Sequence, residues 1–135
     1  MTESGEPLEL LVARDGGPVE LAVEIGAGLI GDWTLRLLRG GALDEAWAGT
    51  SGDRLPDVIQ LDPERLLREG TRLEWIVTVY GPAKDVGFDL GLRAHQGRRR
   101  CVEFPPRRQG ELKARGVAIE RGALIPTLLP PKAAR

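Results

Sequence analysis

The sequence contains few of the residues from which catalytic and metal sites are built. Its 135 residues include one cysteine, Cys101, and one histidine, His95, and aromatic residues make up only 4%. A single cysteine excludes an internal disulfide, and a lone histidine beside it cannot supply the ligands of a structural zinc site. No apolar run approaches the length of a membrane-spanning helix. These scarcities argue against a disulfide-stapled, a zinc-binding and a membrane-spanning protein.

The first ten residues, MTESGEPLEL, carry acidic side chains where a secretion signal has basic ones followed by an apolar segment. Together with the lone cysteine, this predicts a reducing, cytoplasmic setting. Arginine outnumbers lysine by sixteen to three, a usage typical of a GC-rich, bacterial coding sequence. The chain is long enough for one domain with a core of its own.

The clearest structural pattern runs from Asp62 to Tyr80. Asp62 can cap a first helical turn, Pro63 suits the first helical position and Gly70 can end the turn, which predicts one short helical turn near 63–69. A strand with two-residue alternation follows. Its inward positions are Leu73, Trp75, Val77 and Val79. We interpret this stretch as a helical turn that crosses between two sheets and leads into a core strand.

The same alternation recurs along the chain, with turn signals every ten residues or so. Further strand candidates are 8–13, 19–25, 33–38, 42–48, 58–61, 86–94, 100–104 and 112–121. The pattern predicts an all-β protein, an antiparallel sandwich of seven to nine strands. The arrangement of Asp62, Gly70 and Trp75 before a long strand resembles the way immunoglobulin-like domains enter a core strand. The predicted fold is therefore an immunoglobulin-like or related sandwich.

The domain organisation follows from the same elements. Residues 1–7 are expected to be disordered, 8–121 to form a single β-sandwich domain, and 122–135 to form an extended, proline-rich C-terminal tail. Within the domain, residues 8–25 are interpreted as a hairpin, because two alternating segments flank the turn at 15–18.

A glycine-rich motif, VEIGAGLIG, occupies residues 23–31. It resembles the nucleotide-binding fingerprint of flavin-dependent amine and amino-acid oxidases. The resemblance implies an FAD- or NAD-binding oxidoreductase fragment, with Gly26, Gly28 and Gly31 against the pyrophosphate at a helix N-terminus. Against it, Glu24 makes the preceding strand half-solvated, and no further βα units follow. We favour a glycine loop between two strands and expect no cofactor, with the dinucleotide site as the alternative.

A basic segment follows the strand candidate at 86–94. Its six arginines are Arg93, Arg98, Arg99, Arg100, Arg107 and Arg108. Guanidinium groups can bind an acidic protein surface, or the phosphates of a nucleic acid or an anionic lipid. A sequence pI near 5.9 and a single aromatic residue in the segment, Phe104, count against nucleic acid. The remaining interpretation is an arginine-rich hairpin that is merely solvated.

Catalytic candidates are few. His95 and Cys101 stand across a predicted hairpin, so contact is possible, but a lone cysteine on a short strand more often fills the core. Asp85 and Asp89 lack the spacing of a calcium loop. We therefore expect no catalytic site.

The charge distribution suggests a binding role instead. Residues 1–64 carry a net charge of −9 and residues 65–135 a net charge of +8. The sequence thus predicts a non-enzymatic protein-binding or assembly module that uses the basic hairpin and the apolar, proline-rich tail. The partner would be a protein, which includes self-association with the acidic half of a second copy, because opposite charges steer association.

Overall fold

The computed structural model describes residues 7–25, 29–51, 58–102 and 107–129. The strands are β1 (Leu8–Val12), β2 (Val19–Ile25), β3 (Ile30–Arg39), β4 (Ala42–Ser51), β5 (Val58–Leu61), β6 (Thr71–Tyr80), β7 (Gly87–Gln96), β8 (Arg99–Arg100), β9 (Arg107–Glu111) and β10 (Val117–Leu128). A helical turn, α1 (Pro63–Leu66), lies between β5 and β6, and a 3₁₀ turn, η1 (Ala114–Gly116), precedes β10.

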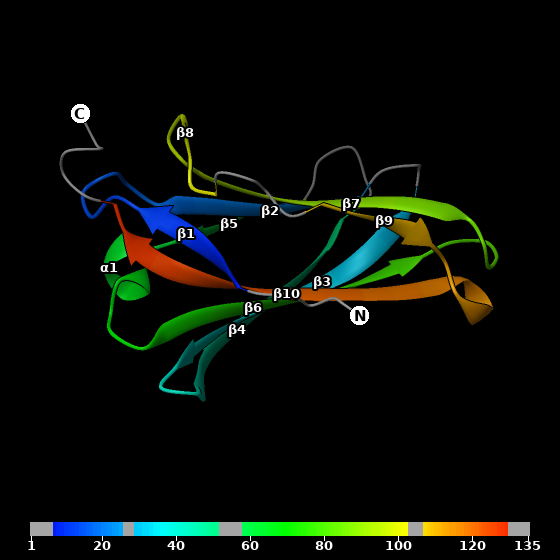
Figure 1. Ribbon diagram of the computed structural model, residues 1–135, viewed down its shortest axis with the longest axis horizontal. Coiled ribbons are helices and arrows are strands. Elements are labelled where there is room, and N and C mark those ends of the chain that lie inside the picture. Colours follow the sequence, from blue (N-terminus) through cyan, green and yellow to red (C-terminus); the bar gives the residue numbers. More distant parts are fainter. Residues whose placement is uncertain (1–6, 26–28, 52–57, 103–106, 130–135) are drawn as a thin grey trace.

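The strands form two sheets that pack face to face (Figure 1). Sheet A has the order β1-β10-β6-β3-β4, and sheet B the order β5-β2-β7-β8, with β9 also paired to β7. All pairings are antiparallel except that of β1 with β10. The prediction of an all-β sandwich is confirmed, and the described chain contains ten strands rather than seven to nine.

The stretch from Asp62 to Tyr80 behaves as its sequence predicts. The Asp62 Oδ1 atom accepts a hydrogen bond of 3.1 Å from the Glu64 backbone N–H, which caps α1. Gly70 has a φ of 80°, the left-handed conformation that only glycine adopts cheaply. The turn carries the chain from sheet B to β6, the middle strand of sheet A. The helix itself is shorter than the predicted 63–69, since it ends at Leu66.

The core lies between the inner faces of the two sheets. From sheet A, the alternating positions of β6 point inward, and from sheet B those of β2 and β7 do so. The buried residues of these three strands include Leu73, Trp75, Val77, Val79, Val19, Leu21, Val23, Phe88, Leu90, Leu92 and Ala94. Burial of this apolar surface is the main stabilising term of the sandwich.

The predicted hairpin at residues 8–25 is wrong, because β1 and β2 belong to different sheets. The backbone of β1 is engaged on two sides, by the parallel partner β10 and by a hydrogen bond of 2.8 Å from the Leu11 N–H to the Cys101 carbonyl. Its buried side chains, Leu10 and Val12, also pack in the common core. The turn at 15–18 therefore connects two sheets instead of two neighbouring strands.

The C-terminal strand also differs from its predicted bounds of 112–121. β10 runs from Val117 to Leu128, so much of the stretch predicted as a tail from residue 122 belongs to sheet A. Pairing with β6 ends at Leu124, opposite Leu73, and Pro126 lies beyond it, beside β1. The missing N–H of proline is tolerated where a ladder has ended. Residues 130–135 of the predicted tail and residues 1–6 of the predicted N-terminal segment lie outside the described residues.

Two further elements were not predicted, namely β9 and η1. No helix in the described ranges is both long and apolar enough to cross a membrane.

Candidate functional site

The basic arginines follow one side of sheet B. Arg93 lies in β7, the segment 98–100 forms the β7–β8 hairpin, and Arg107 and Arg108 lie in β9, which pairs with the other end of β7. The positions paired with Arg100 and Arg107 are four residues apart on β7, about 13 Å at about 3.3 Å per residue. The backbone positions of the basic residues are therefore spread along β7 and the strands paired with it.

Arg93 and Arg99 have partners within the chain. Arg93 forms an ion pair of 3.1 Å with Glu24, and both side chains lie on the outer face of sheet B. Arg99 donates 3.0 Å to the Leu11 carbonyl and also donates to the Gln96 side chain, so it joins β1 to the β7–β8 hairpin. Arg98 is exposed in the hairpin turn. The side chains of Arg107 and Arg108 lie outside the described atoms, so their part in the predicted anion site stays a prediction.

Gln96, the last residue of β7, is a buried polar residue that the sequence analysis did not single out. Its Oε1 accepts 2.9 Å from the Ala13 N–H, and its Nε2 donates 2.7 Å to the Ala13 carbonyl and 2.9 Å to the Gly17 carbonyl. Only 4% of its surface is exposed. With Arg99 bound to the same Oε1, Gln96 holds the β1–β2 connection against β7. The basic hairpin thus has a structural role.

His95 and Cys101 do not form a catalytic pair. Alternation along β7 buries Ala94 and Gln96 and directs His95 to the outer face, whereas Cys101 is fully buried in the core. Burial raises the pKa of the Cys101 thiol, although the nearby Arg99 guanidinium acts in the opposite direction. The thiol therefore stays protonated at neutral pH. Among the described residues, no group of three or more histidine, cysteine, aspartate or glutamate side chains could hold a metal ion.

The glycine motif does not lead into a helix. Residues 30–39, where the nucleotide-binding interpretation requires one, form strand β3, while Gly26 and Gly28 lie outside the described residues. A Cβ atom at Gly31 would stand 2.6 Å from the Thr78 carbonyl oxygen, so this glycine lets β3 approach β6. The space beside Trp33, between the sheets, has a volume of about 10 Å³, room for one water molecule.

The outer face of sheet A carries an uncovered group of large apolar side chains. Ile30, Tyr80 and Ile119 have 59%, 38% and 54% of their surface exposed. Ile30 stands opposite Tyr80, and Ile119 stands opposite Thr78, two positions before Tyr80 on the same face of β6. Neighbours at this diagonal spacing are within reach of long and aromatic side chains. We call Ile30, Tyr80 and Ile119 the apolar cluster.

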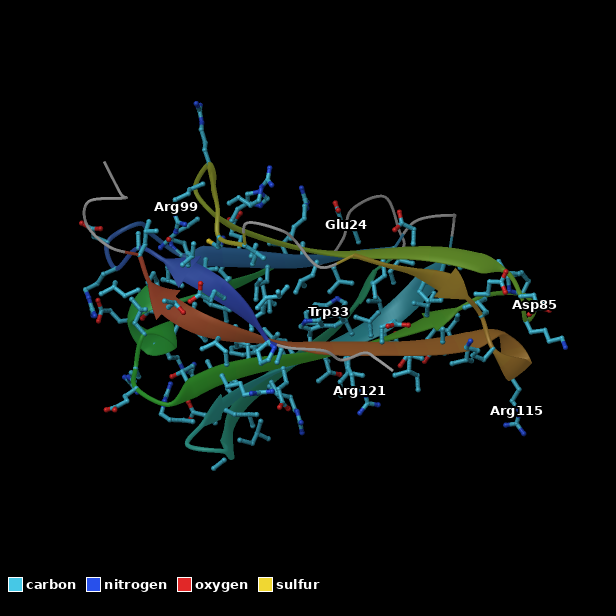
Figure 2. The ribbon with its side chains drawn as sticks, viewed as in Figure 1. Glu24, Trp33, Asp85, Arg99, Arg115 and Arg121 are labelled. Atoms are coloured by element: carbon cyan, nitrogen blue, oxygen red, sulfur yellow. The ribbon has the colours of Figure 1, made fainter. Side chains whose placement is uncertain are left out.

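Further along the same face, the side chains are charged. Glu74 accepts 2.7 Å from Arg36 and lies 3.3 Å from Arg72, so one carboxylate serves two arginines. Arg121, opposite Ile76, points away from the sandwich and makes no ion pair within the described ranges (Figure 2). Arg36, Arg72, Glu74 and Arg121 line a surface hollow of about 280 Å³, the arginine hollow.

Tyr80, a member of the apolar cluster, is hydrogen-bonded to the charged side chain of Asp32. Its hydroxyl donates 3.0 Å to the Asp32 carboxylate, and this hydrogen bond raises the pKa of Tyr80. Because the folded state has the higher pKa, the bond stabilises the fold below about pH 10, the ordinary tyrosine value, and this contribution is lost as the pH rises through the raised pKa.

Tyr80 is the only tyrosine, so its titration can be followed directly by the ultraviolet absorbance of tyrosinate. We expect Asp32→Ala to lower the pKa of Tyr80 towards its ordinary value, because the anionic acceptor is removed. Glu9→Ala, on the exposed part of β1, should leave the titration unchanged. Equal titration curves for the wild type and Asp32→Ala would show that the hydrogen bond does not form in solution.

No protein-family model matches the chain, and no match was found among curated proteins or solved structures. What the protein does must then follow from its own residues. The interior beside Trp33 has little free space, and His95 lies on the outer face of sheet B whereas Cys101 is buried in the core. The apolar cluster and the arginine hollow, both on sheet A, are two surface features of the described residues that fold and packing leave unexplained.

Proposed function

We propose that the protein is a non-enzymatic protein-binding module, and that it binds its partner on the outer face of sheet A. The apolar cluster carries this proposal, because three large side chains on one face are left open to solvent. A half-solvated antiparallel sheet normally places polar residues on its outer face. Exposed apolar groups rimmed by polar residues mark interaction sites on soluble proteins.

The arginine hollow supports a partner that presents carboxylates next to apolar side chains. Three arginines surround one glutamate, and Glu74 is already shared by Arg36 and Arg72, so the hollow is positively charged. Arg121 offers its guanidinium fork to an incoming carboxylate. Aromatic and arginine side chains, such as Tyr80 and Arg121, are the types that dominate binding free energies at protein interfaces.

This location differs from the one predicted from the sequence, while the class of function is kept. The segment predicted as a tail contributes to the binding sheet, because β10 extends through it and carries Ile119 and Arg121 nearby. The predicted basic hairpin is partly committed to internal bonds through Arg93 and Arg99. Nucleic-acid or lipid binding through the Arg93–Arg108 segment, and a cytoplasmic setting, stay predictions.

The proposal is tested by comparing variants in a pull-down from the source organism. We expect the full chain to retain a set of proteins with acidic contact segments. Ile119→Asp should lower the retained amount about tenfold or more, because burying a charge in an apolar contact is costly. Arg121→Glu should also reduce retention, and more strongly at low salt, because it reverses a rim charge.

The matched control lies on the outer face of sheet B. Val58→Asp makes the same kind of change at an apolar position of β5 that is 51% exposed, and should leave retention unchanged. Hydrogen exchange with an isolated partner should show protection on β6 and β10. Retention unaffected by Ile119→Asp, or binding of nucleic acid or anionic vesicles in place of protein, would overturn the proposal.

A further inference from the structure

The edge strands of the two sheets differ in how well they are protected against pairing with another chain. The outer side of β1 is occupied by the Leu11–Cys101 hydrogen bond and by Arg99. β5 has four residues, and β9, with the sequence RRQGE, is charged at both ends. β4 has ten residues, ALDEAWAGTS, with no lysine, arginine or proline. Among the described strands, β4 is therefore the long edge that lacks the lysine and proline guards against pairing with another chain.

The acidic start of β4 is neutralised by its own chain. Asp44 lies 3.1 Å from Arg39 and 3.1 Å from Arg65, and Arg65 also pairs with Glu45. The hydrogen bond from Arg65 lowers the pKa of Asp44. A register shift opposite Leu37 and Leu38 places a bulge at this end of the strand. The regular part of the β4 edge therefore begins at Glu45, beyond the bulge.

Beyond Glu45 the side chains of β4 are small or apolar. Ala46 and Ala48 are exposed on the outer face of sheet A, and Trp47 on the other face is half-buried against the core. In an antiparallel sheet, every second residue of an edge strand directs its N–H and C=O away from its neighbour. From Glu45 to Gly49 the strand thus has outward backbone groups for which the described residues supply no partner, flanked by side chains that do not obstruct another strand.

We propose that β4 pairs with β4 of a second copy of this chain, antiparallel and about a two-fold axis at Trp47. In an antiparallel pair, two residues that stand opposite each other either both direct their N–H and C=O groups towards the partner strand or both direct them away. The two-fold axis must therefore pass between one residue and the same residue of the second copy. An axis at Asp44 or Glu45 places like charges opposite each other. An axis at Trp47 avoids such a clash, with Ala46 opposite Ala48 of the second copy and Glu45 opposite Gly49. Axes at Ala46 and Ala48 avoid it too, and the variants below distinguish the three.

The resulting interface is isologous, and sheet A continues through it from one copy to the other. In Figure 1 the turn between β3 and β4 lies at the lower margin of the ribbon, at the end of the sheet away from β1. Pairing would also bring Trp47 of each copy together across the axis. The proposal does not rest on the partner-binding function, although it would place two copies of that face side by side.

Sedimentation velocity over a range of concentrations tests the proposal on the full chain. The wild type is expected to show a reversible monomer–dimer equilibrium. The double variant A46K/A48K places lysine opposite lysine twice across the axis, and should raise the dimer dissociation constant about tenfold or more. The matched variant A46K/A48E places lysine opposite glutamate twice, and should dimerise at least as well as the wild type.

This pair of variants tests the register as well as the edge. An axis at Ala46 would oppose two lysines in A46K/A48E and an axis at Ala48 two glutamates, so this variant would then dimerise no better than A46K/A48K. Near-identical circular dichroism and melting curves should show that both variants fold. A monomeric wild type at all concentrations, or equal dimerisation of the wild type and A46K/A48K, would overturn the proposal. Dimers that fail in both variants would overturn the axis at Trp47.

Discussion

Replacing Gln96 with leucine should lower the free energy of unfolding by about 3 kcal/mol. The amide of Gln96 serves the Ala13 N–H, the Ala13 carbonyl and the Gly17 carbonyl, at 2.9, 2.7 and 2.9 Å. Leucine has nearly the same size but satisfies none of these groups. Each buried polar group left unpaired costs about 1–3 kcal/mol. The Ala13 carbonyl keeps its hydrogen bond from the Gly16 N–H, and water at the exposed side of the turn recovers part of the remaining loss.

The loss should not be limited to one loop. Arg99 bonds to the same Gln96 oxygen and to the Leu11 carbonyl, so the variant also loosens the contact between β1 and the β7–β8 hairpin. Since the free energy of unfolding of a domain of this kind is about 5–15 kcal/mol, the change should be large in a urea titration.

Gln60→Leu is the matched control for this prediction. It makes the same chemical change in β5, where the Gln60 amide donates 3.1 Å to an exposed Glu20 carboxylate. Surface changes of this type alter stability by about 0.5 kcal/mol or less. If Gln96→Leu were no more destabilising than Gln60→Leu, the amide of Gln96 would not hold the β1–β2 connection.

The features that could be predicted from the sequence are those encoded within one element. Two-residue alternation predicted which residues of β3, β6 and β7 face the core, and the Asp62–Pro63 pair predicted α1 with its N-terminal cap. These patterns depend on neighbours a few residues away, so no knowledge of the fold is needed to interpret them.

What could not be predicted depends on pairing between distant segments. The sequence offers no signal that β1 takes a parallel partner more than a hundred residues away, and a glycine-rich turn at 15–18 suggests a hairpin just as well. β9 has the unremarkable sequence RRQGE and becomes a strand only because β7 lies beside it. Strand formation here follows tertiary context more than local preference.

The same limit applies to the candidate site. Counting charges identified the arginines at 93–108 but could not show that Arg93 and Arg99 have partners inside the chain. Conversely, Ile30, Tyr80 and Ile119 are the outward residues of three different strands, and each is ordinary alone. Only the register of β3, β6 and β10 brings them together. The halves of opposite charge are likewise mixed, since both sheets contain strands from both halves.

The close contact between β10 and Trp75 should make Gly122 almost irreplaceable. A Cβ atom at Gly122 would lie 2.5 Å from Cζ2, 2.7 Å from Cε2 and 2.8 Å from Nε1 of Trp75. The indole cannot move aside easily, because Trp75 is only 4% exposed and is packed in the core. We expect Gly122→Val to lower the free energy of unfolding by about 3 kcal/mol, the upper part of the range for overpacked cores.

A double-mutant cycle can assign this loss to the contact itself. Trp75→Phe removes the part of the ring that carries Cζ2 and Nε1, so in its presence Gly122→Val should cost about 1 kcal/mol less than alone. Ala123→Val is the control, because it adds the same side chain one residue later, on the outer face opposite Glu74. Urea titrations of the four members of the cycle measure the coupling. Purely additive losses would mean that Gly122 is required for its backbone and not for the space it leaves to Trp75.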